Sequence, residues 1–399
     1  MISRRRVLQG AGVLTVLAAA GAVYRATTTG IFSAGEGVAY EPWRAWSTEM
    51  ATGPLALVRA GILASSAHNT QPWLFRVYPD AIELYADPAR NLGPLDPMRR
   101  EMFVSLGCCL ENMVLAAVPA GYKVDLDVRP GPLEAIARAS GPELVARLDL
   151  GAGEKFTSGF FNYILARRTN RGPYQPDVPL SGMELTTLNG MADKYDDLTL
   201  TVFVPRLARE RLGALIVDAT EAIIAVPEMV RATDAWIRPN RAEVAAHRDG
   251  LTLDSLTLPP ALTALAKMLP APDAATMHEM WLEATRDVHV ATAAAFGVVS
   301  VENPLDRLTS LRVGRLWQRL HLFATRRGVA MQPLNQPLEM RDREMVLGLS
   351  PEFTRRLERL TPNGRTAHFL FRAGFPVRPA APSPRRSAEE VVLDRVARR

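Results

Sequence analysis

Two short polar stretches carry the residue types best suited to holding a cofactor. Residues 65–73 read SSAHNTQPW, and their hydroxyls, amides and imidazole can hydrogen-bond the edge of a flat heteroaromatic ring. Residues 167–171 read RRTNR and place three guanidiniums within five residues, an array suited to a phosphate dianion. A ring and a phosphate together indicate FMN. The alternatives are an Asx-type turn leading into a strand at the first stretch and a solvated charged face at the second.

The two stretches resemble the two best-known motifs of the nitroreductase-like flavoprotein family, which read roughly PSxxNxQPW and RRSxR. The resemblance implies an FMN-binding oxidoreductase in which flavin N5 passes a hydride from NAD(P)H, or from another donor, to a small nitroaromatic or quinone-like acceptor. It implies no catalytic acid or base from the protein, which orients and stacks the reactants.

The resemblance also implies which side chains hold FMN. Four polar residues of the first stretch would line the ring and the ribityl chain: Ser66, His68, Asn69 and Gln71. His68 departs from the small residue common at its position in the family. The arginine-rich stretch would bind the phosphate and the O2/N1 edge through Arg167, Arg168, Thr169 and Arg171. A segment after the second core helix would lie on the N5 side, at Gln332, Pro333 and Leu334, and near the C-terminus Arg385 would reach the phosphate.

Two apolar segments with helical spacing, residues 104–122 and 313–330, are separated by 207 positions. Gly107 and Gly121 in the first correspond to Gly314 and Gly328 in the second, and the apolar face is kept. This pattern predicts a duplicated core helix, with chance agreement as the alternative. Shorter patterns predict a helix at 54–63 and strands at 74–78, 82–85, 124–128 and 198–204.

Members of the family are usually homodimers with FMN between the subunits. Together with the repeat, this implies an α+β fold, a three-layer α/β/α sandwich whose two duplicated lobes form an intramolecular pseudo-dimer, monomeric as a chain. The lobes are expected at residues 43–130 and 156–399. Only the second carries the arginine-rich motif, because residues 41–59 offer just Arg44 and Arg59. One FMN per chain is therefore expected.

Residues from about 236 to 292 form an insert broken by five prolines. It is either a packing insert or a lid over the flavin. A lid that closes the site would make the chain a catalytically weak FMN-binding or storage protein, which is the alternative to an oxidoreductase. A flavin-free structural module would leave both polar motifs without a role.

The N-terminal residues 1–35 have the parts of an export signal. Three arginines at positions 4–6 precede an apolar run at 11–23 and a small, polar exit. Arginines followed by Val-Leu resemble a twin-arginine signal, so the twin-arginine export machinery is an expected partner. The run is shorter than the ~20 residues of a spanning helix, and a weak membrane anchor is the alternative. The expected location is the periplasm or the cell-envelope side of the membrane.

Composition limits the other classes of function. The chain has 399 residues, 48% hydrophobic and 22% charged, as in soluble globular proteins. Much of the net charge of +5 lies at the two ends, so no nucleic-acid partner is expected. Cys108 and Cys109 are adjacent in an apolar segment, which predicts buried thiols rather than a disulfide. The six histidines lack metal-ligand spacing, and no metal is expected.

Overall fold

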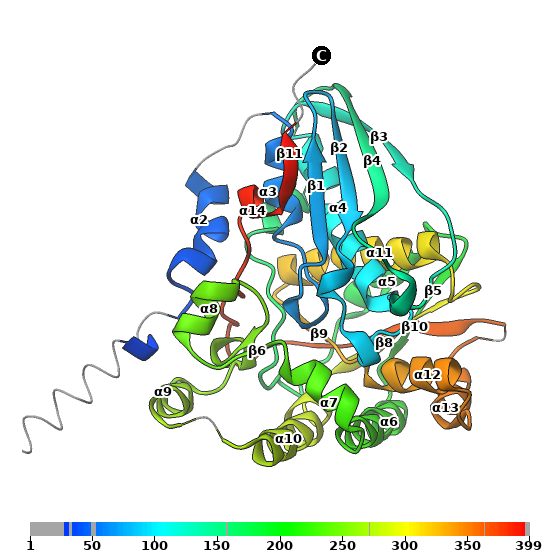
Figure 1. Cartoon of the computed structure of the whole chain (residues 1–399). Coiled ribbons are helices and arrows are strands. Elements are labelled where there is room, and N and C mark those ends of the chain that lie inside the picture. The colour runs from blue at the N-terminus through cyan, green and yellow to red at the C-terminus, as the bar shows by residue number, and fades with distance from the viewer. Residues whose placement is uncertain are drawn as a thin grey trace, which may run out of the picture.

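The computed structural model describes residues 28–31, 34–48, 53–156, 159–270, 272–362 and 364–395 (Figure 1). The predicted export signal at residues 1–35 lies almost entirely outside these ranges. Among the described helices, none has the length and apolar character needed to cross a membrane.

Two main sheets form the framework. The first has the strand order β11-β1-β2-β4-β3 and the second the order β5-β8-β10-β9. The strands of the first are β1 (Trp73–Val77), β2 (Ala81–Ala86), β3 (Tyr122–Val128), β4 (Glu143–Ala152) and β11 (Val392–Arg395). Those of the second are β5 (Leu198–Phe203), β8 (Ala295–Val301), β9 (Ala330–Pro333) and β10 (Thr366–Gly374). The four strands predicted from sequence, β1, β2, β3 and β5, are confirmed within a residue or two.

The two halves repeat one order of elements. Helix α4 (Arg100–Ala117) follows the first two strands of the first sheet, and α11 (Arg307–Arg326) follows the first two strands of the second. The order β1-β2-β4-β3 therefore corresponds to β5-β8-β10-β9, strand by strand. Mixed helices and sheets confirm the predicted α+β class, and the shared order supports the duplication.

The two core helices cross at the glycines that define the repeat. A Cβ on Gly107 would lie 2.2 Å from the carbonyl oxygen of Leu311, and a Cβ on Gly314 would lie 2.0 Å from that of Val104. Val104 and Leu311 are also 207 residues apart. The contact is therefore reciprocal, as an approximate two-fold axis between the helices requires.

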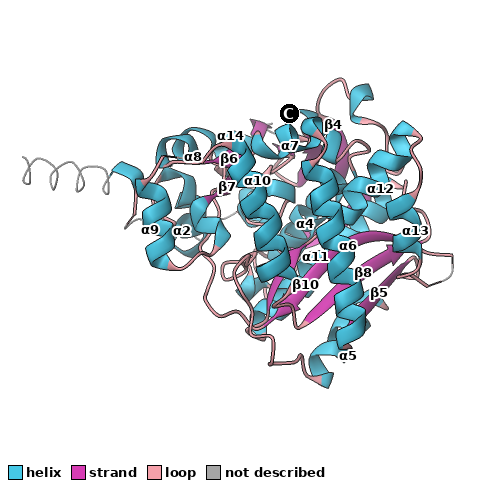
Figure 2. Cartoon of the chain, turned by 90° about the horizontal axis from the view of Figure 1, so that it is seen from below, coloured by secondary structure: helices cyan, strands magenta, loops and turns pink. Residues whose placement is uncertain are grey.

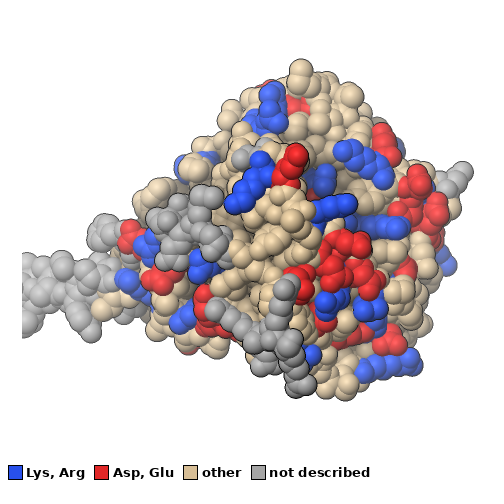
Figure 3. Space-filling view, turned by 90° about the horizontal axis from the view of Figure 1, so that it is seen from above, with Lys and Arg blue, Asp and Glu red and all other residues tan. Residues whose placement is uncertain are grey.

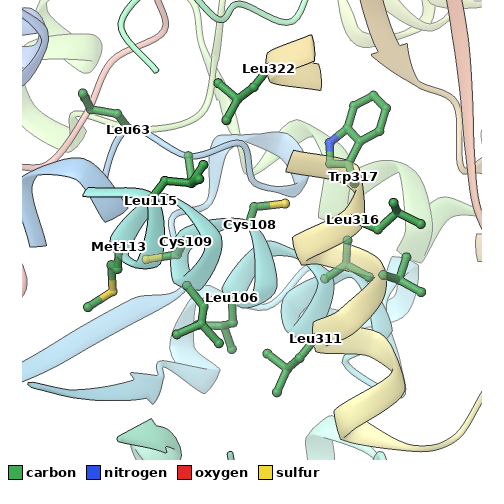
Figure 4. Close-up of a cluster of buried hydrophobic side chains, with 14 of the residues drawn as sticks. Leu63, Leu106, Cys108, Cys109, Met113, Leu115, Leu311, Leu316, Trp317 and Leu322 are labelled. Carbon is green, nitrogen blue, oxygen red and sulfur yellow. The ribbon is translucent and has the colours of Figure 1, made fainter. Parts of the chain in front are cut away.

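The largest apolar core surrounds these helices. Figure 4 shows Cys108 and Cys109 on α4 together with Leu311, Leu316 and Trp317 on α11. Both thiols are free and buried, as predicted. A second core lies on the other face of the second sheet, where α6 (Arg206–Ile224), α12 (Gln336–Leu347) and α13 (Glu352–Glu358) pack (Figure 2). The second sheet is thus covered by helices on both faces.

The first sheet extends beyond the lobe boundary expected at residue 130. Strand β4, whose apolar and polar residues alternate imperfectly, pairs with both β2 and β3. Strand β11 comes from the C-terminal end of the chain and pairs in parallel with β1. The range 156–399 therefore supplies a strand to the first sheet. The edge of that sheet at β1 has backbone groups that need partners, and β11 provides them.

The insert in the second lobe is longer than the sequence pattern indicated. It separates β5 from β8, whereas their counterparts β1 and β2 are joined by a three-residue turn. Besides α6, it contains α7 (Pro227–Asp234), β6 (Ile237–Arg238), α8 (Arg241–His247), β7 (Leu251–Thr252), α9 (Pro260–Met268) and α10 (Ala274–Glu283). Its middle part, from β6 to β7, lies near α2 (Glu41–Thr48) and α14 (Ala388–Val391) in Figure 1.

The remaining described α-helices are α3 (Leu55–Gly61), which confirms the helix predicted at 54–63, and α5 (Gly182–Ala192). On the face shown in Figure 3, basic and acidic side chains lie side by side rather than forming a surface of one sign. That face does not have the charge distribution of a nucleic-acid-binding surface.

Candidate functional site

The loop between α3 and β1 meets the C-terminal segment. The guanidinium of Arg385 donates to Oδ1 of Asn69, and the Asn69 amide donates to the carbonyl of Pro384 at 3.0 Å. The backbone N–H of Arg386 donates to Oε1 of Gln71 at 2.9 Å. Asn69 and Gln71 therefore share one hydrogen-bond network with Arg385, which lies more than 300 positions further along the chain.

The arginine-rich stretch is held against the same region from the second lobe. The backbone N–H of Asn170 donates to Met331 in β9 at 3.3 Å, and Thr169 pairs with Met331 as an isolated bridge. The ring of His321 in α11 lies 3.0 Å from the carbonyl oxygen of Arg168. Arg167 reaches the first lobe, where its Nη2 donates to the carbonyl of Leu63 at 3.2 Å. The motifs of the two lobes are thus brought together, as predicted.

Arg167, Arg168 and Arg385 form an arginine cluster, and two of the three lie against Trp43. The guanidinium carbons of Arg168 and Arg385 lie 4.0 and 5.0 Å from the centroid of the indole. Arg167 and Arg385 are 2% and 1% exposed, yet no carboxylate of the described residues forms a salt bridge with any of the three. Nε and Nη1 of Arg167 and Nε of Arg385 are buried without a hydrogen-bond acceptor. Buried charges normally have partners, so these donors are suited to an anion.

The electrostatics of the cluster support the same conclusion. Burial lowers the pKa of Arg167 to about 10, and burial together with the charge of Arg167 lowers that of Arg168 to about 9. Burial and repulsion from both neighbours also lower the pKa of Arg385. The guanidiniums of Arg167 and Arg168 remain protonated at neutral pH, since both pKa values stay above 7. A bound dianion would relieve both the desolvation and the repulsion.

The loop that carries Ser66 has an unusual backbone. His68, Asn69 and Gln71 have φ values of 45°, 56° and 53°, in the left-handed region that non-glycine residues rarely adopt. The conformation is held by the hydroxyl of Ser66, which accepts from Gln71 N at 3.1 Å, and by that of Ser105, which accepts from Ala67 N at 3.0 Å. Clustered backbone strain of this kind is typical of functional loops.

His68 and Arg171 interact electrostatically with each other. Burial, with a contribution from the charge of Arg171, lowers the pKa of His68 to about 4, so its imidazole is neutral at physiological pH. Arg171 has a pKa lowered to about 10 by burial, and its Nη1 donates to the carbonyl of Ser255 at 3.4 Å. The pair supplies one further positive charge and one neutral donor or acceptor.

The residues expected on the N5 side are largely engaged within the fold. The amide oxygen of Gln332 accepts from Nε of Arg372 at 2.8 Å, and the Leu334 N–H donates to Leu370 at 2.9 Å. Pro333 has no N–H and is the only one of the three predicted residues that is partly exposed. The backbone amide of Leu334 is therefore not available to a ligand, because β10 already uses it.

The insert covers both motifs. The Asn69 amide donates to Gly250 at 3.2 Å, the Gln71 amide donates to Arg248 at 2.9 Å, and Arg171 donates to Ser255. Residues 248–255 therefore lie across the first-lobe loop and reach the arginine-rich stretch. Sequence reasoning left open whether this region is a lid or a packing insert and did not identify the contacting segment.

Two further residues of the site have no motif. Trp43, at the start of α2, lies between two arginines of the cluster, and Arg372 is fully buried in the apolar strand β10. The Arg372 guanidinium lies 3.9 Å from the centroid of Tyr174 and donates to the carbonyl of Gly172 at 2.7 Å. A charged residue within the run FLFRAG was the only sequence signal for it. In the described part of the chain, no group of three or more His, Cys, Asp or Glu residues is placed to hold a metal ion.

No family model matches the chain. It is 26% identical over 346 residues to Rv3131 of Mycobacterium tuberculosis strain H37Rv, provisionally named an NAD(P)H nitroreductase, covering 83% of this chain and 88% of that protein. It is 29% identical over 135 residues to acg of the same organism, named in the same way, covering 33% and 39%.

Solved structures of proteins described as nitroreductases are also similar to parts of the chain. One from Anabaena variabilis, so described provisionally, has 12% identity and a TM-score of 0.41, with 74% of this chain and 69% of that chain covered. NfnB from Mycobacterium smegmatis, solved in complex with NADPH, has 16% identity and a TM-score of 0.35, with 59% and 97% covered.

Proposed function

We propose that this protein is an FMN-dependent NAD(P)H oxidoreductase of the nitroreductase type. The observation that carries the proposal is the arginine cluster, in which Nε and Nη1 of Arg167 and Nε of Arg385 are buried without an acceptor. A phosphate dianion fits such a donor set, since it accepts several charge-assisted hydrogen bonds at once. The names of the mycobacterial relatives add independent support.

In this proposal the chain binds and orients the cofactor. Arg167, Arg168 and Arg385 hold the phosphate, and the polar side chains of the strained loop, with Ser66 and Asn69 foremost, bind the ring and ribityl chain. Bound FMN supplies hydride transfer at N5. Arg171 places a positive charge at the ring's O2/N1 edge, while His68 stays uncharged because its pKa is lowered to about 4. The acceptor is a small nitroaromatic or quinone-like compound.

Anaerobic mixing of the FMN-loaded protein with NADPH tests this function. We expect the yellow colour to bleach and to return on adding a quinone. A protein that neither contains FMN nor takes it up would overturn the flavoprotein proposal altogether. A loaded protein that NADPH leaves oxidised would favour the second candidate instead.

The second candidate is an FMN-binding or storage protein whose insert closes the site. Its support is the set of hydrogen bonds from Asn69, Gln71 and Arg171 to residues 248–255. Gly250→Ala should loosen this segment, because Gly250 has φ +74° and a Cβ there would lie 2.4 Å from the carbonyl of Trp236. Under this candidate the variant is reduced by NADPH faster than the parent chain. Gly93→Ala is the control, with φ +57° and open space at its Cβ.

We also propose that the chain is exported by the twin-arginine route, on the basis of Arg4, Arg5 and Arg6 and the short apolar run that follows. Replacing the three arginines with lysine preserves the charge and should leave the protein in the cytoplasm. Continued export of the lysine variant would point to another route, and retention in the membrane fraction would point to an anchor.

A further inference from the structure

A cavity of about 560 Å³ opens in the second lobe between α5 and α11. Its lining includes the apolar side chains of Phe160 and Met191, and Gly190, which adds no side chain to the cavity. The lining also contains Tyr195 and three cationic side chains, those of Lys194, Arg315 and Arg319. This volume lies within the range of small-molecule sites.

The cavity occupies the position that corresponds, under the duplication, to the neighbourhood of the arginine cluster. The 207-residue offset relates Arg315 in α11 to Cys108 in α4. The thiol of Cys108 lies beside Ser65 and Arg167, which both lower its pKa against the larger effect of burial. The cavity is thus the second half-site of the pseudo-dimer.

A shorter connection explains why the cavity is open. Eleven residues, 62–72, join α3 to β1 in the first lobe, and they include the loop proposed to line the flavin. Only five, 193–197, join α5 to β5 in the second lobe. The second half-site therefore lacks the ring-binding loop, and no arginine-rich stretch exists in the first lobe to complete it for FMN.

The cavity has more cationic side chains than carboxylates to pair with them. Glu111, which is fully buried, accepts from Nε of Arg315 at 2.8 Å and from Nε of Arg319 at 2.5 Å. One carboxylate therefore faces two guanidiniums, and Lys194 adds a third cation. Among the described residues, no acceptor is bonded to the Nη atoms of Arg315 or Arg319, whose side chains remain 23% and 26% exposed.

We propose that this cavity binds a planar aromatic anion smaller than FMN, such as an aromatic carboxylate. The carboxylate pairs with the Nη edges of Arg315 and Arg319, which are pre-oriented because Glu111 fixes their Nε atoms. The ring lies against Phe160 and Met191 and over Gly190, which leaves room for it. This site is separate from the proposed flavin site and does not depend on it.

Calorimetric titration of the purified full chain with 2-naphthoate tests the proposal, with neutral 2-naphthamide as the charge control. We expect one site per chain for the carboxylate and binding at least about tenfold weaker for the amide, since a charge-assisted contact is lost. Gly190→Phe fills the cavity and should abolish binding, because a Cβ at Gly190 meets no atom within 4 Å. Gly182→Phe is the matched control on the same helix, also with open space at its Cβ and outside the cavity lining.

Each outcome decides the assignment. Loss of binding in Gly190→Phe with retention in Gly182→Phe supports the second half-site, whether or not the chain carries flavin. Unchanged binding in Gly190→Phe overturns it. Equal affinity for the carboxylate and the amide overturns the anion specificity. Displacement of FMN by 2-naphthoate, seen as release of free flavin, would place the ligand in the flavin site and would also overturn the proposal.

Discussion

At the scale of single residues, the burial and the missing hydrogen-bond acceptors of Arg167 are the strongest indication of an anion site. Its guanidinium is 2% exposed, donates one hydrogen bond to a backbone carbonyl and leaves Nε and Nη1 without acceptors. A charge buried in this way destabilises the protein until an anion arrives. The same residue is therefore unfavourable for folding without ligand and favourable for binding.

Arg167→Met should separate these two effects, because Met has a similar length and no charge. We expect the apoprotein to become more stable to heat, while FMN affinity falls by at least about tenfold through loss of a charge-assisted contact. Thermal unfolding and fluorescence titration with FMN measure the two quantities. Arg206→Ala, at a side chain that is 85% exposed, should change neither. A loss of stability without a loss of affinity would mean that Arg167 is only structural.

The carboxyl of Glu101 lies in a second buried charged cluster, at the start of α4, with Arg100, Asp96 and Asp342. Burial, with repulsion from the two aspartates and opposed by Arg100, raises the pKa of Glu101 from 4.5 to about 7. The folded state therefore holds a proton that the unfolded state releases above pH 4.5. This contribution to stability is complete below pH 4.5 and is lost as the pH rises through 7.

Glu101→Gln removes that titration. The difference in free energy of unfolding, variant minus parent chain, should be more positive at pH 8 than at pH 5. Urea denaturation at both pH values measures it. Glu352→Gln, at a side chain that is 69% exposed, provides the comparison. The same difference from the parent chain at both pH values would contradict a raised pKa at Glu101.

How far the sequence predicts the site depends on how local each contact is. Ser66, Asn69, Arg167 and Arg168 belong to short motifs, so their residue types already indicate their chemistry. Trp43 and Arg372 act through partners distant in sequence, and a lone tryptophan or a lone arginine in an apolar strand carries no such signal. The availability of the Leu334 amide could not be predicted either, because it depends on the pairing of β9 with β10.

At the scale of elements, the crossing of α4 and α11 depends on the absence of side chains at two positions. Gly107→Ala would place a Cβ 2.2 Å from a backbone oxygen of the partner helix, and backbone cannot move aside as a flexible side chain can. We expect destabilisation of at least about 1–3 kcal/mol, measured by chemical denaturation. Gly190→Ala in α5 has open space and should be neutral or stabilising by up to about 1 kcal/mol. Equal effects would show that the crossing is not tight.

The elements also show where sequence patterns fail. Regular alternation identified β1, β2, β3 and β5, and helical spacing identified α4 and α11. Strand β4 was missed because its alternation is imperfect, and β11 was missed because only its pairing with β1 defines it. The insert is longer than predicted because α6 and α7 have the amphipathic patterns of ordinary core helices. They are recognised as part of the insert only when β5 and β8 are compared with β1 and β2, which a short turn joins.

At the scale of the whole molecule, one chain contains two copies of a β-β-α-β-β unit around a pseudo-two-fold axis. Both copies contribute to the proposed flavin site, with the arginine-rich stretch from one and the polar loop from the other. The second half-site lacks both motifs. Under the proposed function, one half-site is kept while the other is changed, and one FMN per chain is expected.

The central claim is that the arginine cluster holds the phosphate of FMN, and titration of the apoprotein with FMN and with riboflavin tests it most directly. The two ligands share the ring and ribityl chain and differ only in the phosphate. Loss of two charge-assisted contacts, each worth about 1.5–3 kcal/mol, predicts that FMN binds at least about 100-fold more tightly than riboflavin, with one FMN per chain. Equal affinities for the two flavins, or binding of neither, would contradict the account.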